Sequence, residues 1–204
     1  NLDLMYGLPE QTRAQALDDL EAALALEPTH VSHYQLTLEP GTAFFHSPPA
    51  LPLEDETWEM QVECQGLLAR RGFAQYEVSA YARPAHESRH NLNYWEFGDY
   101  IGIGAGAHGK LTFPDSQCIV RTERARGPRE YMAAIDTGME PAQARVAPGQ
   151  LPFEFLLNAL RLKSGFTRYG FESRTGLALE TLGEPLEGAR ARGLLRCSDP
   201  ESWR

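Results

Sequence analysis

The stretch NLDLMYGLPEQTRAQALDDL, residues 1–20, decides the fold class of this sequence. Apolar residues recur at every second position of LDLMY, which predicts a strand over residues 1–6 with Asp3 on its polar face. After a Gly-Leu-Pro turn, Thr12 and Gln15 have the spacing of a capping box, and an apolar stripe follows at helical spacing. A strand that leads into an amphipathic helix is the first half of an α/β unit.

The same order of elements continues along the chain. VSHYQLTL, residues 31–38, alternates with period two and predicts a second strand whose polar face carries His33 and Thr37. An acidic start predicts a second helix that ends at Gly72, and FAQYEVSAY, residues 73–81, predicts a third strand. That helix carries the apolar residues Trp58, Val62, Leu67 and Leu68. Strand, helix, strand, helix, strand is typical of parallel α/β units, and polar faces on successive strands favour a barrel over an open sheet.

The pattern changes in the second half of the chain. KLTF, residues 110–113, and QCIVRT, residues 117–122, flank a Pro-Asp turn and predict an antiparallel hairpin, with a short helix near residues 130–136. After Ala147, apolar residues at helical spacing precede another short helix and a strand, which is typical of a winged-helix-like module. The apolar residues at helical spacing in the first of these helices are Phe153, Leu156, Leu157 and Leu160.

Composition limits the classes of function. The 204 residues carry a net charge of −9 and no basic stripe, which argues against binding nucleic acid. No apolar stretch approaches the roughly 18 residues of a membrane span, and no leader pattern opens the chain, so we expect a cytoplasmic protein. The first strand begins without a preceding turn, which is typical of a piece of a longer chain. Cys64, Cys118 and Cys197 have no paired spacing and are expected to be idle or buried thiols.

The stretch RHNLNYWEFGDYIGIGAGAHG, residues 89–109, raises two alternatives for a cofactor site. Gly104, Gly106 and Gly109 form G-x-G-x-x-G after a short predicted strand, but no helix follows, which disfavours a dinucleotide site. The glycines could equally allow backbone to approach a bound cofactor or make a tight strand exit.

The histidines show no spacing typical of a metal site. His30 and His46 are expected at the surface in loops, and His33, His86, His90 and His108 are the histidines of greater interest. His90 precedes Asn91, Tyr94 and Trp95 in a predicted loop. A neutral imidazole can ligate haem iron, and aromatic rings can pack on a porphyrin, but a loop histidine beside an arginine is usually just solvated, and the residues alone favour that explanation.

Five stretches carry a family resemblance: NLDLMYGLPEQT, HYQLTLEPGT, YEVSAYARP, RHNLNYWEFGDYIGIGAGAHGKLTF and FEFLLNALRL. In this order and spacing, the chain resembles the HemW family of haem chaperones in the radical SAM superfamily, which is similar to the oxygen-independent coproporphyrinogen III oxidases. The H-N-x-x-Y-W element, residues 90–95, separates the two groups.

The resemblance implies an α/β fold: the C-terminal half of a radical SAM partial (β/α) barrel, a β hairpin extension and a small winged-helix-like domain. It implies three cofactors, namely S-adenosylmethionine, haem and a 4Fe-4S cluster. By position, the S-adenosylmethionine residues would be Asp3, Thr37, Gly104, Gly106 and His108. The haem residues would be His90, as axial ligand to the iron, with Asn91, Tyr94 and Trp95. The parts expected are residues 1–112 for the barrel strands, 113–146 for the hairpin and connection, and 147–204 for the helical domain.

One departure from the family pattern is severe. The family holds its cluster with C-x3-C-x2-C near the N-terminus, and this element is absent, so the chain is expected to be a family member truncated at both ends and inactive alone. The function implied is haem delivery to apo-proteins, with membrane-associated respiratory proteins among the expected partners. The alternative is a coproporphyrinogen III oxidase-like enzyme, and a dinucleotide-dependent oxidoreductase is disfavoured.

Overall fold

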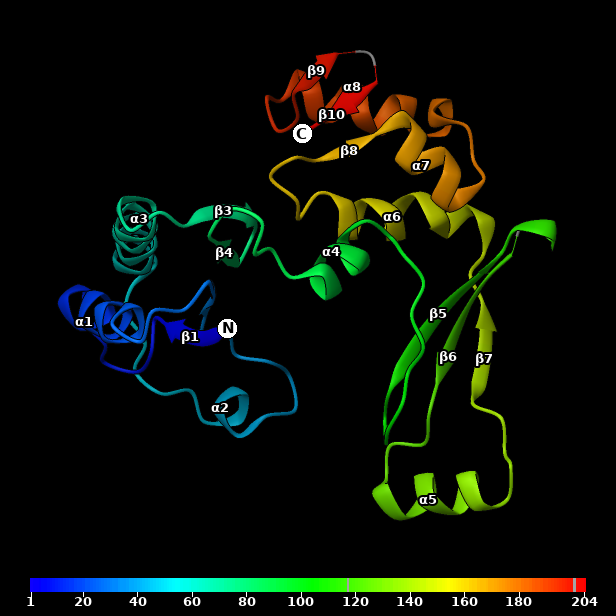
Figure 1. The fold of residues 1–204 in the computed structure, drawn as a ribbon, viewed down its shortest axis with the longest axis horizontal. Helices are drawn as coiled ribbons and strands as arrows, with labels where there is room; N and C mark the ends of the chain where they lie inside the picture. The colour runs from blue at the N-terminus through cyan, green and yellow to red at the C-terminus, as the bar shows by residue number, and fades with distance from the viewer. Residues whose placement is uncertain (117, 200) are drawn as a thin grey trace. The chain divides into compact units, whose positions relative to one another are not determined.

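The computed structural model describes residues 1–116, 118–199 and 201–204 and divides the chain into two compact units, Asn1–Ser88 and Arg89–Arg204 (Figure 1). Each unit has a hydrophobic core of its own. Helices alternate with strands in both, which confirms the predicted α/β class. The three-part division stays a prediction. In the described part of the chain, no helix is both long and apolar enough to cross a membrane.

The first unit is a four-stranded sheet in the order β1-β2-β4-β3, with α1 and α3 packed on one face. Its elements are β1 (Leu2–Tyr6), α1 (Arg13–Leu24), β2 (His30–Gln35), α2 (Ala43–His46), α3 (Glu54–Arg70), β3 (Ala74–Glu77) and β4 (Ala80–Ala82). Strands β1 and β2 are parallel, as predicted for a strand-helix-strand unit. These strands form an open sheet, with no closed barrel among the described residues.

The third predicted strand, residues 73–81, is a hairpin in the structure. Strand β4 runs antiparallel to both β2 and β3, so only β1 and β2 form a parallel pair. The turn follows Glu77, whose carboxylate accepts a hydrogen bond from the Ser79 N–H at 3.0 Å. That hydrogen bond stabilises the turn. The alternation of apolar and polar residues does not reveal the turn, because it continues through it as in a single strand.

The faces of β2 are the reverse of those predicted. The parallel register pairs Leu2 with Val31 and Leu4 with His33, so Val31 and His33 face the helices. Tyr34, predicted on the apolar face, is 41% exposed. Val31 is fully buried, so the residues at alternate positions from it also point toward the core. Shifting this alternation by one residue moves every side chain of the strand to the opposite face of the sheet.

Helix α3 buries only part of the apolar set named from the sequence. Leu67 and Leu68 pack in the core with Met60 and Cys64, whereas Trp58 is 64% and Val62 is 48% exposed. The buried positions recur every three or four residues along the side that meets α1.

The second unit begins with α4 (Arg89–Trp95) and a three-stranded antiparallel sheet in the order β5-β6-β7. Its strands are β5 (His108–Phe113), β6 (Cys118–Glu123) and β7 (Ala142–Arg145), and α5 (Pro128–Asp136) joins β6 to β7. The predicted hairpin and short helix are confirmed, although Gln117 lies outside the described residues and β7 was not predicted.

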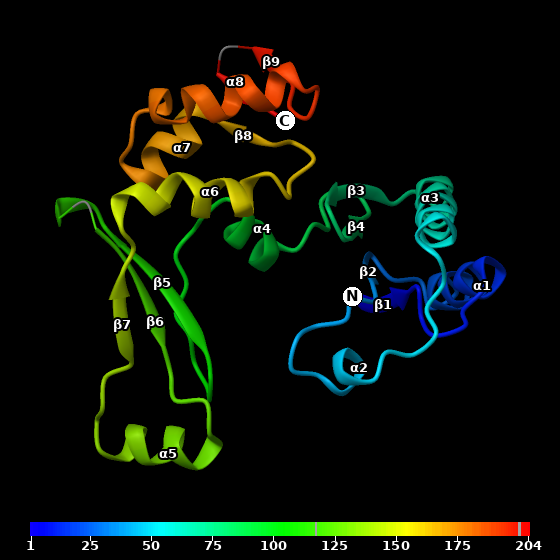
Figure 2. The same cartoon turned by 180° about the vertical axis from the view of Figure 1, so that it is seen from behind.

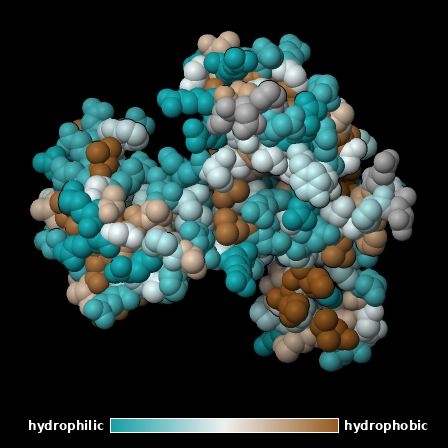
Figure 3. Space-filling view, turned by 45° about the horizontal axis from the view of Figure 1, so that its top comes forward, coloured by the Kyte–Doolittle hydropathy of each residue, from teal (hydrophilic) through white to brown (hydrophobic). Residues whose placement is uncertain are grey.

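Helix α5 lies at one end of this sheet, and the remaining helices of the unit lie toward the other end (Figures 1 and 2). Hydrophobic side chains gather on the surface around α5 (Figure 3). Met132, Ile135 and Met139 are 56%, 48% and 65% exposed there.

The rest of the second unit combines short helices with a small sheet in the order β8-β10-β9, in keeping with the winged-helix-like prediction. Its elements are α6 (Leu151–Ala159), β8 (Phe166–Thr167), α7 (Arg168–Thr175), α8 (Gly183–Ala191), β9 (Cys197–Asp199) and β10 (Ser202–Trp203). Single 3₁₀ turns span Pro114–Ser116, Pro148–Gln150 and Leu179–Leu182. Of the apolar residues named for α6, Leu156 packs against the core, whereas Phe153 and Leu157 are 69% and 62% exposed, and Phe155 and Ala159 are the buried residues.

Candidate cofactor-binding sites

Asp3 lies on the face of the first sheet that α1 and α3 leave uncovered. The parallel register places Ser32 beside it, and the Asn1 side chain donates to the Asp3 carboxylate at 3.0 Å. Hydrogen bonds from Ser32 and Asn1 hold the pKa of Asp3 below its usual range. The polar face predicted for Asp3 is confirmed, and its carboxylate is an acceptor suited to hydroxyl groups.

His30 extends this polar network, although the sequence predicted an exposed loop residue. Its ring Nδ1 lies 2.6 Å from the Asn1 side-chain oxygen, and its Nε2 lies 2.8 Å from the Tyr76 hydroxyl. The side chain is buried, and burial lowers the pKa of His30. The partners explain the error, because His30 opens β2 and its ring packs edge-on against Tyr76, 46 residues away.

The other residues assigned to S-adenosylmethionine have diverse environments. Thr37 follows the end of β2, is exposed, and donates its hydroxyl to Glu39 at 2.9 Å. Gly104, Gly106 and His108 belong to the second unit, where both glycines have positive φ and His108 opens β5 in an exposed position. The Gly106 N–H donates to the Ala125 carbonyl at 2.8 Å. This backbone pairing favours the strand-exit explanation of the glycines.

The H-N-x-x-Y-W element is helix α4 rather than the predicted loop, since residues 89–95 contain neither glycine nor proline. His90 and Tyr94 are one turn apart, and their rings meet edge to face with centroids 4.7 Å apart. Tyr94 in turn packs on Tyr100 at 4.4 Å. Asn91 and Trp95 share the neighbouring face, about 100° further round the helix.

The two faces of α4 offer different chemistry. His90 is exposed, so its ring is accessible to a metal-bearing ligand. Trp95 is partly buried, with the Arg161 guanidinium 4.2 Å from the centre of its ring. Its indole Nε1 is buried and has no hydrogen-bond partner among the described residues. The element therefore presents its histidine and its tryptophan in different directions.

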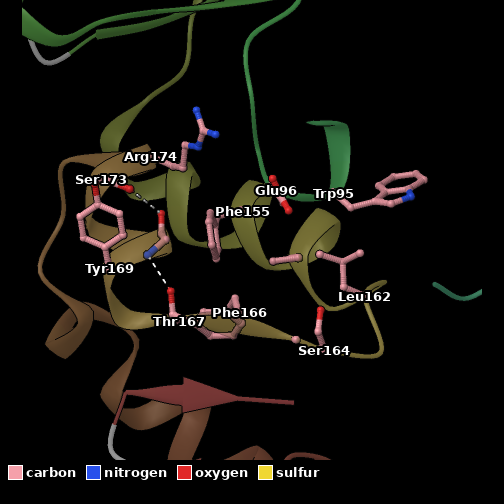
Figure 4. A pocket seen from close by; sticks show the side chains of 13 residues that line it. Trp95, Glu96, Phe155, Leu162, Ser164, Phe166, Thr167, Tyr169, Ser173 and Arg174 are labelled. Carbon is pink, nitrogen blue, oxygen red and sulfur yellow. Dashed lines mark hydrogen bonds between the residues drawn. The ribbon is translucent and has the colours of Figure 1, made fainter. Parts of the chain in front are cut away.

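A pocket of about 580 Å³ opens beside Trp95, between α4, α6, β8 and α7 (Figure 4). Phe155, Leu162 and Phe166 give it apolar walls, while Thr167 and Arg174 contribute polar groups. Its size is typical of small-molecule sites. The sequence did not reveal it, because its walls come from separate elements. His90, Asn91 and Tyr94 are not among its lining residues.

The cysteines do not fit an iron-sulfur cluster. Cys64 is fully buried in α3, and burial raises its pKa to about 11. Cys118 is buried in β6, which belongs to the other unit, and Cys197 is partly buried. Among the described residues, no group of three histidine, cysteine or acidic side chains could hold a metal ion.

Comparison with known proteins gives consistent names. The chain is 47% identical over 200 residues to the haem chaperone HemW of Escherichia coli, covering 98% of this chain and 52% of that protein. The HemW of Haemophilus influenzae is 42% identical, with 100% and 52% covered, and that of Lactococcus lactis is 33% identical, with 89% and 47% covered. No family model matches the sequence.

A solved structure shares the fold. The coproporphyrinogen III oxidase HemN of Escherichia coli, described as a radical SAM enzyme, matches with a TM-score of 0.70 at 17% identity, over 99% of this chain and 50% of that one. The chain spans about half the length of the curated relatives it matches. Along almost all of its residues, the chain is therefore similar to haem chaperones named HemW, and its fold is similar to that of HemN.

Proposed function

We propose that this chain is the haem-binding part of a haem chaperone of the radical SAM superfamily, which carries haem to apo-proteins. The observation that carries the proposal is the exposed His90 on α4, backed by the ring of Tyr94 at 4.7 Å. A neutral imidazole with one free ring nitrogen is a common axial ligand of haem iron. The names of the curated relatives support the same ligand.

Asp3 is the residue of the first unit best suited to S-adenosylmethionine, because its ionised carboxylate can accept hydrogen bonds from ribose hydroxyls. Thr37, in the loop after β2, would contribute from the same unit, and Gly104, Gly106 and His108 stay predicted S-adenosylmethionine residues of the second unit. A 4Fe-4S cluster would need ligands other than the three cysteines of this chain. Bound haem supplies an iron atom with open axial positions, and His90 holds a nitrogen lone pair for one of them.

The test is a haem titration of the chain and of His90→Ala. We expect the substitution to weaken ferric haem binding by about tenfold or more, because an iron ligand is lost, and to change the Soret absorbance. His86→Ala is the matched control, since His86 is also exposed and belongs to no predicted site. An unchanged haem spectrum and affinity in His90→Ala would refute His90 as the ligand.

A further inference from the structure

An apolar groove runs along α5 in the second unit, and we call it the α5 groove. Tyr131 and Ile135 of the helix belong to its floor, and its volume is about 320 Å³. One wall is residues 123–126, at and after the end of β6, and the other is residues 139–142, which lead into β7. The Gly104 N–H donates to the Tyr131 hydroxyl at 3.2 Å and ties the helix to the segment before β5. The groove is therefore preformed in the fold.

The groove and its rim expose several large apolar side chains. Ile135 and Met139 line the groove and are 48% and 65% exposed, and Met132 on the same helix is 56% exposed. Hydrophobic side chains gather on the surface around α5 (Figure 3). Exposed apolar patches of this kind mark surfaces that bind a protein or a membrane, and methionine side chains adapt readily to an apolar partner.

The wall that follows β6 is basic. RARGPR, residues 124–129, carries three arginines and no acid, in a chain whose net charge is −9. Among the residues that the structure describes, two of these arginines meet no carboxylate, and the third pairs with Glu123 at 3.1 Å. Glu140 lines the opposite wall, whereas Glu130 and Asp136 lie on α5 and do not line the groove. Carboxylates of a partner are therefore favoured along one side of the groove.

We propose that the α5 groove docks an amphipathic helix of a partner protein, with the apolar stripe of that helix on Ile135 and Met139 and its carboxylates beside residues 124–129. A helix in a groove gains affinity from its apolar stripe and orientation from its flanking charges. The two walls make the surface concave, which suits a helix better than a flat lipid surface. The inference goes beyond the proposed haem function, since no residue predicted to bind haem or S-adenosylmethionine lines the groove.

The probe is a designed peptide of about 18 residues, long enough for a stable helix, with leucines at helical spacing and glutamates along one side of them. Fluorescence anisotropy of the labelled peptide measures its binding to the 204-residue chain. A second peptide keeps the leucines and has lysine in place of every glutamate. We expect the lysine peptide to bind about tenfold or more weakly, because its charges meet the arginines of the basic wall.

Two variants test the floor and the basic wall separately. Ile135→Lys places a charge on the apolar floor, and Arg126→Glu reverses a charge on the wall. Both side chains are exposed, so the fold should be retained, which circular dichroism verifies. Each variant should weaken binding of the glutamate peptide by about tenfold or more. Arg126→Glu should also bind the lysine peptide more tightly than the unchanged chain does.

The matched controls make the same changes elsewhere in the second unit. Leu194→Lys and Arg190→Glu alter exposed side chains that do not line the groove. Both should leave the affinity for the glutamate peptide within about twofold. Equal affinity of the chain for the two peptides, or equal effects of Ile135→Lys and Leu194→Lys, would overturn the proposal.

Two further measurements distinguish the other occupants of such a surface. Co-sedimentation with vesicles of phosphatidylcholine and phosphatidylglycerol that Ile135→Lys abolishes would overturn the proposal and assign the groove to a membrane. A dimer in sedimentation velocity that Ile135→Lys dissociates would overturn it in favour of a second copy of this chain. We expect neither vesicle binding nor dimerisation through the groove.

Discussion

The His33 side chain lies in the core of the first unit, where its ring stacks on Tyr6 with centroids 4.6 Å apart. Burial lowers its pKa from 6.5 to about 4. Between these pH values the unfolded chain binds a proton that the folded chain excludes. The stabilising effect of the neutral ring is therefore complete above pH 6.5 and is lost as the pH falls toward 4. Burial lowers the pKa of His30 as well, which adds a change of the same sign.

We predict that the first unit loses about 2 kcal/mol of unfolding free energy through His33 alone between pH 7 and pH 5. Urea denaturation at the two pH values measures this loss. The His33→Phe variant keeps a ring against Tyr6 but has no group to titrate, so its dependence on pH should be weaker by that amount. The same pH dependence in both proteins would mean that His33 is already protonated in the fold.

At the scale of single residues, the sequence predicts the environment of a side chain where that environment depends on residues nearby in the chain. Asp3 is on a polar face because strand alternation is local. The burial of His30 depends on Asn1 and Tyr76, which are 29 and 46 residues away. His90 and Trp95 point in different directions because they lie on different sides of a helix. This difference can be predicted only once the segment is known to be helical.

At the scale of elements, a buried lysine ties β5 to the segment that precedes it. Lys110 is 1% exposed, and its Nζ donates to the Asp99 carboxylate at 2.8 Å and to the Phe97 carbonyl at 3.0 Å. The same ammonium lies 4.2 Å from the centre of the Phe97 ring. Burial lowers the pKa of Lys110, and the bond to Asp99 opposes that effect. The pair is asymmetric, because the Asp99 side chain is 40% exposed.

This asymmetry predicts unequal effects of removing either partner. Asp99→Ala leaves a buried ammonium without its counter-charge and should lower the unfolding free energy by about 3 kcal/mol. Lys110→Met keeps the apolar stem, leaves a carboxylate that water can reach, and should cost about 1 kcal/mol. Urea denaturation followed by tryptophan fluorescence measures both, with Asp136→Ala on α5 as a surface control. Equal losses would show that the ion pair is not the cause.

The elements also show where sequence patterns suffice. The capping box of α1 was predicted correctly, because Thr12 and Gln15 bond to each other's backbone N–H within one turn. The buried sides of α3 and α6 were not predictable in full, because apolar residues occur on more than one side of each helix. Which side is buried depends on the element that packs against the helix. Met60 of α3 is buried in the core that α3 shares with α1, and Phe155 of α6 is buried against Phe97.

At the scale of the whole molecule, the chain is two units with separate cores, and each carries part of the proposed chemistry. The polar sheet face with Asp3 belongs to the first unit, and α4 with the pocket beside Trp95 belongs to the second. The order of strands and helices made the α/β class predictable. The division after Ser88 was not, because FAQYEVSAYARP continues into the H-N-x-x-Y-W element without a linker-like composition.

The distribution of cysteines between the units gives the last prediction. A cluster needs several thiolates that converge, yet Cys64 is fully buried in the first unit with a pKa raised to about 11 by burial, and Cys118 is buried in the second. Anaerobic reconstitution of this chain should therefore give iron and sulfide far below the stoichiometry of a 4Fe-4S cluster. Replacing all three cysteines with alanine should leave the small iron content unchanged. A stoichiometric cluster that disappears when any one cysteine is replaced would show that the thiols can converge, and that the folded arrangement rearranges to bind metal.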